Sequence, residues 1–326
     1  MDGKMKRRLN YDFFMEFLDG SLAGILNMVH NDTTLIMELR GNKVVIYYRG
    51  GALFTITNTG KGYEIYHNPA YWLPEKKYEE LVTDPSPEEC VKNVALYKHQ
   101  MDYYRSINPE LEAQCLLQLV LENNILPGKS KTTGDYFILD IEYAYKEQGG
   151  LNLRFDAIGL NWPSTSSDRR KRIDMGITFF EMKYYDGAMK GKAGIQKHIS
   201  DYRAFIETKA YFDMCRDMEG VFWQKYHLGL IPAYMMPTNL DDKDANIIID
   251  ENKVDLAFLF ANRDPDSTIA KAELSAAVEK YGKERTQDIY VANASDIGYV
   301  LFRYKDNGKG QGKADRYIRI ADYVNL

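Results

Sequence analysis

Residues 179–187 read FFEMKYYDG, an aromatic run that carries a glutamate and a lysine two positions apart, Glu181 and Lys183. Aromatic residues at this density predict a β-strand. Because side chains alternate across a strand, Ile177, Phe179, Glu181 and Lys183 project from one face. A charged side chain inside a buried strand costs free energy unless it is paired, bound to a metal ion or used in chemistry. The stretch therefore predicts a buried strand that carries a functional site.

The segments around this strand alternate between helical and strand patterns. A helix pattern begins at Asn108 and Pro109 and continues through ELEAQCLLQLVLENNI, and the runs DYFILDIEYAY, LNLRFDAIGL and MGITFFEMKYY follow it as three strands. Downstream, helical spacing covers about 192–209 and about 267–281 with an apolar run, VDLAFLFAN, between them. Further strands are expected around 289–304 and 316–324. This interleaving predicts a mixed α/β fold with helices on both faces of a central sheet.

The N-terminal part of the chain has a pattern of its own. Apolar residues at helical spacing predict one helix over 11–29, and β-rich runs broken by glycines predict antiparallel hairpins over 33–68. Asp-Pro and Ser-Pro breaks place a linker at 74–88, ahead of an amphipathic helix from about Pro87 to Arg105. The sequence thus divides into a helix and hairpin module with its linker at 1–105, a core at 106–262, and a C-terminal α/β extension at 263–326 that packs on the core.

Composition narrows the class of protein. The chain has 326 residues, of which 45% are hydrophobic, and a formal net charge of -5, which argues against a protein that coats nucleic acid over its whole surface. Its three cysteines lack metal-type spacing and are odd in number, which argues against a disulfide framework. No apolar run is long enough for a transmembrane helix or a signal peptide. We therefore expect a soluble cytoplasmic protein without membrane contact, in which any nucleic-acid site is local.

A second carboxylate is expected beside Glu181. Asp156 lies on the preceding strand, on the face of Ile158 and opposite the face of Phe155 and Ala157. Sequential strands are usually neighbours in a sheet, so Asp156 can approach Glu181. Two carboxylates with a lysine adjacent suit a hard divalent cation such as Mg²⁺, and the lysine can orient water or stabilise charge on a phosphorus-centred transition state. The group predicts metal-assisted hydrolysis of a phosphodiester.

This pattern, Asp156 and then Glu181-Met-Lys183 on consecutive strands between two helices, resembles the PD-(D/E)XK nuclease superfamily. The resemblance covers roughly residues 108–262, about half of the chain. It implies a restriction-endonuclease-like three-layer α/β/α core with a mixed central sheet, to which the N-terminal β-rich module is added. It also implies that Asp156 and Glu181 bind the metal and that Lys183 positions the attacking water. The implied cofactor is Mg²⁺, with Mn²⁺ as an alternative ion.

The RecB-like branch of that superfamily implies two more site residues. It carries an acidic residue on the leading helix, matched here by Glu112 with Glu110 as the competing residue, and a glutamine after the ExK strand, matched by Gln196. Carried over, Glu112 would be a further metal ligand, and Gln196 would contact the substrate or the catalytic group. The branch places a tyrosine four residues after that glutamine, whereas this chain has Ser200 there and its tyrosine at Tyr202.

Basic residues gather around the glutamate and lysine pair. Between Asn161 and Arg203 the chain has nine basic and five acidic residues, a local charge of +4 within a chain of -5. Such residues would hold the backbone of a nucleic acid without reading its bases, although a solvated loop is the competing interpretation of the arginine run. The residues expected to make this contact are Arg169, Arg170, Lys171, Arg172, Lys190, Lys192 and Lys197.

Some residues have plainer interpretations. Glu181 and Lys183 could be a solvent-facing ion pair of little value to stability. Asp140 and Glu142, two apart on an earlier strand, are expected to pair with basic neighbours rather than to join the site. His198 is expected to have a helix-surface or capping role.

Together these features predict a Mg²⁺-dependent nuclease that acts on DNA in antiviral (phage) defence, repair or mobile-element biology. Double-strand cleavage by such a site usually requires two copies, so a homodimer is one expected partner, and an ATPase or sensor subunit is another. Two rival functions stay open. One is a catalytically silent nuclease fold that binds nucleic acid or protein, and the other is an interaction protein that uses the strands of 33–68.

Overall fold

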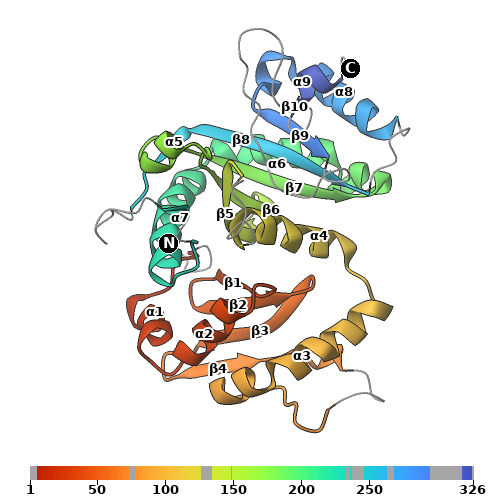
Figure 1. Ribbon diagram of the computed structural model, residues 1–326. Helices are drawn as coiled ribbons and strands as arrows, with labels where there is room; N and C mark the ends of the chain where they lie inside the picture. Colours follow the sequence, from red (N-terminus) through yellow and green to blue (C-terminus); the bar gives the residue numbers. More distant parts are fainter. Residues whose placement is uncertain are drawn as a thin grey trace.

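The computed structural model describes residues 6–72, 78–125, 134–147, 149–232, 235–236, 246–262, 268–293 and 318–324. Its elements form a mixed α/β fold with two sheets, as the sequence predicts (Figure 1). Parts of the predicted linker at 74–88 and of the strands expected at 289–304 and 316–324 lie outside the described residues. Within the described ranges, no helix combines the length and the apolar character needed to span a bilayer.

The N-terminal module is a four-stranded antiparallel sheet with helices packed on it. Its strands are β1 (Ile36–Leu39), β2 (Lys43–Tyr48), β3 (Gly51–Asn58) and β4 (Tyr63–Tyr66), which confirms the predicted hairpins. The helix α3 (Pro87–Ile107) starts with a capping box between Ser86 and Glu89. The single helix predicted over 11–29 is wrong, because the chain forms α1 (Tyr11–Leu18) and α2 (Ala23–Asn31). Between them the Glu16 carboxylate accepts hydrogen bonds from the backbone and hydroxyl of Ser21, both at 2.9 Å, which closes the turn.

The main sheet has six strands in the order β10-β9-β8-β7-β6-β5. The three strands predicted in a row are β5 (Tyr136–Lys146), β6 (Asn152–Asn161) and β7 (Met175–Tyr184), and they pair in an antiparallel manner. Next come β8 (Ile249–Ala261) and β9 (Ile289–Asn293), which run parallel to β7, and then β10 (Ile318–Arg319), which is antiparallel to β9. The C-terminal segment therefore extends the same sheet.

Helices cover both faces of the main sheet. On one face, α4 (Leu111–Val120) packs its leucines against Ile138, Phe180 and Leu259. On the other face, α6 (Ile195–Ile206), α7 (Lys209–His227) and α8 (Ile269–Tyr281) pack against the aromatic residues of β6, β7 and β8. Two short helices, α5 (Ser166–Arg170) and α9 (Ile320–Tyr323), complete the described elements of the core. The sequence pattern had not indicated α7, which begins where the Thr208 side chain caps the backbone of Tyr211.

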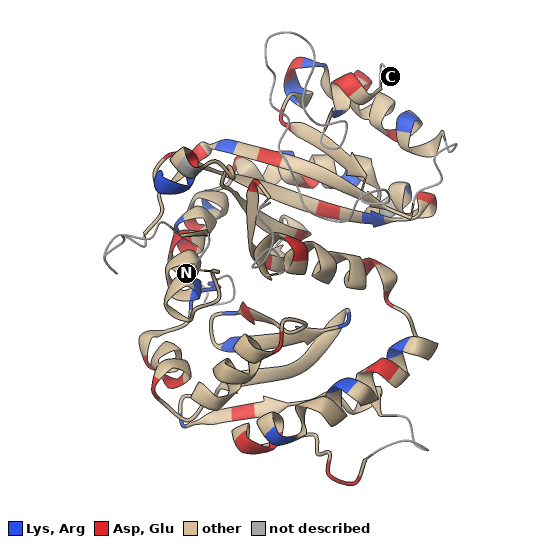
Figure 2. Cartoon of the chain, viewed as in Figure 1, with Lys and Arg blue, Asp and Glu red and all other residues tan. Residues whose placement is uncertain are grey.

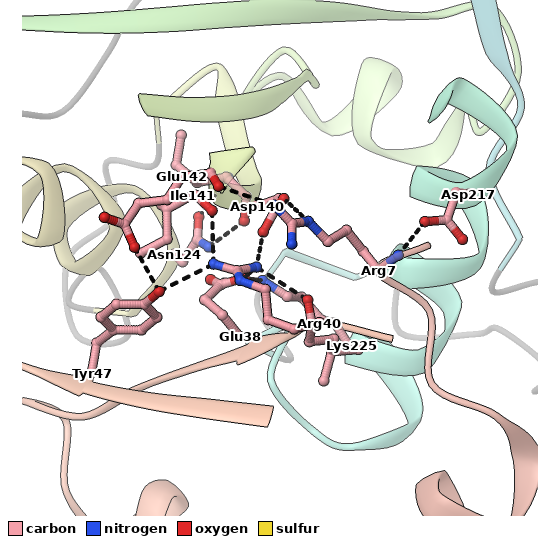
Figure 3. A network of polar contacts seen from close by, with 12 residues as sticks. Arg7, Glu38, Arg40, Tyr47, Asn124, Asp140, Ile141, Glu142, Asp217 and Lys225 are labelled. Carbon is pink, nitrogen blue, oxygen red and sulfur yellow. Dashed lines mark hydrogen bonds and ion pairs between the residues drawn. The ribbon is translucent and has the colours of Figure 1, made fainter. Parts of the chain in front are cut away.

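Buried ion pairs fasten the N-terminal module to the core (Figure 3). Asp140 of β5 pairs with Arg7 at 2.8 Å and also with Arg40, and its side chain is only 1% exposed. Lys225 of α7 donates to both carboxyl oxygens of Glu38 at 2.9 Å. The prediction that Asp140 pairs with basic neighbours is thus confirmed. One apolar cluster also runs from the helices of the module into the core, so the boundary expected near residue 105 does not separate two hydrophobic cores.

We predict that replacing Lys225 by methionine lowers the free energy of unfolding by about 3–5 kcal/mol, because it leaves the carboxylate of Glu38 buried without its main partner. Urea denaturation measures the change. The matched control is Lys209→Met in the same helix, whose pair with Asp213 leaves the lysine 74% exposed, and we expect about 0–1 kcal/mol there. Equal losses in the two variants would contradict a structural role for the buried pair.

Candidate functional site

The site lies where β6 and β7 separate. Their pairing runs from Asn161 and Gly176 to Ala157 and Phe180 and stops there, although both strands continue. Beyond that point the side chain of Asp156 spans the gap, and its Oδ2 accepts a hydrogen bond from the backbone N–H of Met182 at 2.8 Å. The Asp156 carboxylate thus takes the position of a missing ladder partner and reaches β7 beside Glu181.

Glu181, Lys183 and His198 form a buried cluster next to Asp156. The Oε2 atom of Glu181 lies 3.7 Å from Nζ of Lys183 and 3.0 Å from Nδ1 of His198. Nε2 of the same imidazole is 3.1 Å from Nζ of Lys183 and 3.0 Å from the carbonyl oxygen of Ala193. Glu181 is 0% exposed and Lys183 is 4% exposed. The solvent-facing interpretation of this pair is therefore wrong, since both charges lie inside the protein.

Sequence reasoning placed His198 on the helix surface, but the structure places it inside the site. The inward residues of α6 are Ile195, Ile199 and Tyr202. His198 lies three residues after Ile195 and four before Tyr202, so it falls on the same inward-facing side of the helix. The helical period was thus a signal in the sequence that could have identified this histidine.

Burial dominates the electrostatics of the cluster. It raises the pKa of Asp156 to about 7, with a further contribution from the Glu181 carboxylate, and it raises the pKa of Glu181 to about 8 against the opposing effect of Lys183. Burial and the Lys183 ammonium lower the pKa of His198 to about 4, so the imidazole is neutral near pH 7. Although Nδ1 of His198 lies 3.0 Å from Oε2, neither carboxyl oxygen of Glu181 accepts a hydrogen bond from the described residues. These oxygens would therefore be stabilised by a proton or by a cation.

The leading helix α4 contributes one carboxylate to the edge of the site. Oε2 of Glu112 accepts from the backbone N–H of Tyr184 at 3.3 Å, and its charge raises the pKa of both Asp156 and Glu181. The competing residue, Glu110, lies 3.4 Å from Arg105 instead and is 63% exposed. Of the two acidic candidates on this helix, Glu112 is thus the one that contacts the site strand.

The carboxylates provide the donor type that Mg²⁺ prefers, and one or two of them are usual for this ion because it keeps several waters. The unsatisfied oxygens of Glu181 fit such an ion, with Asp156 beside them. As the side chains stand in the described ranges, no three His, Cys, Asp or Glu residues form a ready cage for a metal. An ion would therefore be held by two close carboxylates, with Glu112 at the edge.

Gln196 does not join the cluster. Its Nε2 atom donates at 2.7 Å to the carbonyl oxygen of Glu273 in α8, so the side chain connects two helices. The catalytic role that the RecB-like pattern suggested for it has no support from a contact with Glu181 or Lys183.

The predicted basic contacts are dispersed. Arg169 is buried, donates to the carbonyl of Gly134 at 2.6 Å and lies 4.5 Å from the ring of Trp162, which gives it a packing role rather than a surface for DNA. It belongs to α5, which precedes the start of β7 (Figure 1). At 3.3 Å per residue, Glu181 lies about 20 Å further along that strand. The arginine run is thus at the opposite end of the sheet from the site.

The other basic residues differ in their exposure. Arg170, Lys171, Lys190 and Lys197 are exposed and Arg172 is half-buried. Lys171 and Lys197 pair with acidic neighbours in their own segments, and the side chain of Lys192 lies outside the described residues. Figure 2 shows Lys and Arg interspersed with Asp and Glu along the drawn chain rather than gathered in one stripe.

A hollow of about 440 Å³ opens beside Asp156. Its core wall includes Glu112, Glu142, Arg154 and Asp156, and its opposite wall comes from β2 and β3 of the N-terminal module.

Comparison of the chain with protein-family models, with curated proteins and with solved structures gives no match.

We predict that Glu181→Gln changes how the stability of the metal-free protein depends on pH. Because the folded protein holds the Glu181 proton more tightly than the unfolded chain does, the free energy of unfolding falls as the pH rises from about 4.5 to about 8. The glutamine variant lacks this loss and should gain on the order of 1–3 kcal/mol over the wild type at pH 8.5 relative to pH 5. Urea denaturation in EDTA measures it.

The matched control for this measurement is Glu64→Gln, which removes an exposed glutamate from β4. We expect its curve of stability against pH to follow that of the wild type. A parallel curve for Glu181→Gln would mean that burial does not hold a proton on Glu181.

Proposed function

We propose that this protein is a metal-dependent nuclease with a restriction-endonuclease-like core, which hydrolyses phosphodiester bonds of DNA. The observation that carries the proposal is the convergence of Asp156, Glu181 and Lys183 at the point where β6 and β7 separate. The element order supports it as well, since the helix α4, three antiparallel strands with the short α5 between the second and third, the two helices α6 and α7, and the parallel strand β8 follow one another.

Asp156 and Glu181 would hold the metal ion, Mg²⁺ or Mn²⁺, with Glu112 assisting from the edge. When bound, such an ion polarises a phosphoryl oxygen and lowers the pKa of a coordinated water. The chain's own contribution is to keep both carboxylates in a dry environment, where their attraction for a cation is stronger than in water. Loss of their protons is then coupled to the arrival of the ion.

Lys183 would position the attacking water and stabilise negative charge on the phosphorus centre. Its ammonium is 4% exposed and lies between the Glu181 carboxylate and the His198 ring. A buried cation of this kind is fixed before the reaction, which is how an enzyme stabilises a transition-state charge without reorganisation. The His198 imidazole is uncharged near neutral pH. It contacts both Glu181 and Lys183 and so helps to hold them in place. Because it carries no positive charge, it does not compete with Lys183 for the anionic substrate.

A catalytically silent nuclease fold is the second candidate, and one observation favours it. The Gln196 side chain, which the RecB-like pattern would aim at the substrate, is bonded to α8 instead. Such a protein would bind DNA or a protein partner without cutting it.

The test of the nuclease is cleavage of plasmid and of a labelled single-stranded DNA, each with Mg²⁺, with Mn²⁺ and with EDTA. We predict cleavage that needs the metal and falls by at least about 10²-fold in kcat in Glu181→Gln and Lys183→Met, which keep the shape of the side chains and remove one charge each. The controls are Glu64→Gln and Lys209→Met, which remove exposed charges elsewhere. DNA binding without cleavage, unchanged in all four variants, would favour the silent fold.

We further predict that Mg²⁺ binds at least about tenfold more tightly at pH 8.5 than at pH 6, because carboxyl groups with pKa values of about 7 and about 8 must lose their protons first. Titration calorimetry in two buffers of different ionisation enthalpy measures both the affinity and the protons released. The double variant Asp156→Asn, Glu181→Gln should bind weakly at both pH values. Equal wild-type affinity at pH 6 and pH 8.5 would contradict the assignment of these two residues as ligands.

A further inference from the structure

The hollow beside Asp156 is a route by which a substrate could reach the proposed catalytic groups. Asp156 and Glu112 border it, whereas Glu181 and Lys183 lie behind them with 0% and 4% exposure. A phosphate that approaches Asp156 through this hollow passes between the core and the strands β2 and β3. The N-terminal module is thus part of the surface that the substrate meets.

The size of the hollow limits what can enter it. Its volume of about 440 Å³ is within the range of about 300–1,000 Å³ that is typical of pockets for small ligands. A pocket of this class accommodates a nucleotide but not two paired strands. Enzymes that act inside such pockets take a nucleotide that is already unpaired, or they must pay the free energy of unpairing it.

The wall formed by the module is held in place. Tyr47 lines the hollow, and its hydroxyl donates at 2.8 Å to Glu142 on the opposite wall. Beside this contact, Arg40 donates to the carbonyl of Ile141 at 2.7 Å and pairs with buried Asp140, as Figure 3 shows. Separating a pair of this kind removes the partner that each buried charge needs. Swinging the module away to admit a duplex would break several such contacts at once.

The lining of the hollow offers one exposed cationic group to a nucleic-acid backbone. Arg154 is exposed on a wall that also carries carboxylates, whereas Arg105, Tyr47 and Tyr71 are only 6%, 9% and 7% exposed and form the packed floor of the hollow. Proteins that bind single strands combine cationic groups for the backbone with aromatic rings on which bases stack. Arg154 is the exposed cationic group that the lining offers to such a backbone.

We propose that this hollow admits one unpaired DNA strand to Asp156 and excludes base-paired DNA, so that the substrate class is single-stranded DNA or an unpaired end. The proposal rests on the nuclease function proposed above. It assigns to β2 and β3 of the N-terminal module the role of selecting the strand.

The first test compares three substrates of one sequence: a single strand, a duplex with an unpaired tail, and a duplex closed by hairpin loops at both ends. We expect kcat/KM for the single strand to exceed that for the closed duplex by at least about tenfold, with cutting of the tailed duplex confined to its tail. Cutting within the paired region of the closed duplex at a rate comparable to the single strand would overturn the proposal and leave the nuclease function intact.

The second test fills the hollow. Thr55 of β3 lines it, and Thr55→Trp should lower kcat/KM on the single strand by at least tenfold while leaving Mg²⁺ affinity and the melting temperature unchanged. The matched control is Thr57→Trp, two residues along the same strand and equally half-buried but outside the lining, which should cut like the wild type. Full activity of the Thr55 variant would overturn the proposal.

A third measurement separates this proposal from the nuclease function. Fluorescence anisotropy with the Glu181→Gln protein compares its affinity for the labelled single strand and for the closed duplex. At least tenfold tighter binding of the single strand, weakened by Thr55→Trp, would support the hollow as a strand site even in a protein that cuts nothing. Equal binding of both forms of DNA, or binding of neither, would overturn it.

Discussion

The separation of β6 from β7 is the constraint on which the site depends. Had their ladder continued past Ala157 and Phe180, backbone groups would have met there and left no space for side chains. The Asp156 carboxylate closes the gap by accepting from Met182 N–H, a donor that would otherwise be buried and unpaired at a cost of about 1–3 kcal/mol. Asp156 therefore satisfies a backbone donor of the sheet and also contributes its carboxylate to the site. The hydrogen bond from Met182 fixes the position of that carboxylate.

Burial of charge is the energetic counterpart of this arrangement. Two carboxyl groups and one ammonium group lie in the interior with a neutral imidazole, and the pKa shifts of Asp156 and Glu181 show that the folded protein favours their protonated forms. The attraction of Lys183 offsets only part of the cost of desolvating Glu181. Extensive apolar packing on both faces of the sheet supplies the stability that the site does not. An environment that disfavours two anions favours the arrival of a divalent cation.

Element order and short connections sufficed to predict the first three strands of the main sheet and their pairing, which brings Asp156 to β7. Regular alternation of faces did not hold at Asp156. The roles of Arg169 and Gln196 depended on distant partners, Gly134 and Glu273, which no local pattern identifies. His198 differed, because the helical period of α6 indicates an inward position there and the expected helix-surface role overlooked that signal. The docking of the N-terminal module rests on Arg7 and Arg40 meeting a carboxylate about a hundred residues away, which spacing cannot reveal.

One backbone distortion connects that docking to the site. Strand alternation predicts that Phe155 and Ala157 lie on one face of the sheet. In the structure Phe155 packs toward α7 and Ala157 toward α4. Their partners on β5, Tyr143 and Ile141, lie on opposite faces in the same way. The change of face occurs at Glu142, whose φ of 52° is costly for a residue with a long side chain and persists only where neighbours enforce it.

Those neighbours belong to the N-terminal module: Tyr47 bonds the Glu142 carboxylate and Arg7 its carbonyl oxygen, at 2.8 and 3.0 Å. Asp156 lies on β6 between Phe155 and Ala157, the two residues where the face changes, so its side chain leaves the regular alternation and turns into the gap between strands. The module therefore helps to shape the strand that carries Asp156, in addition to walling the hollow in front of it.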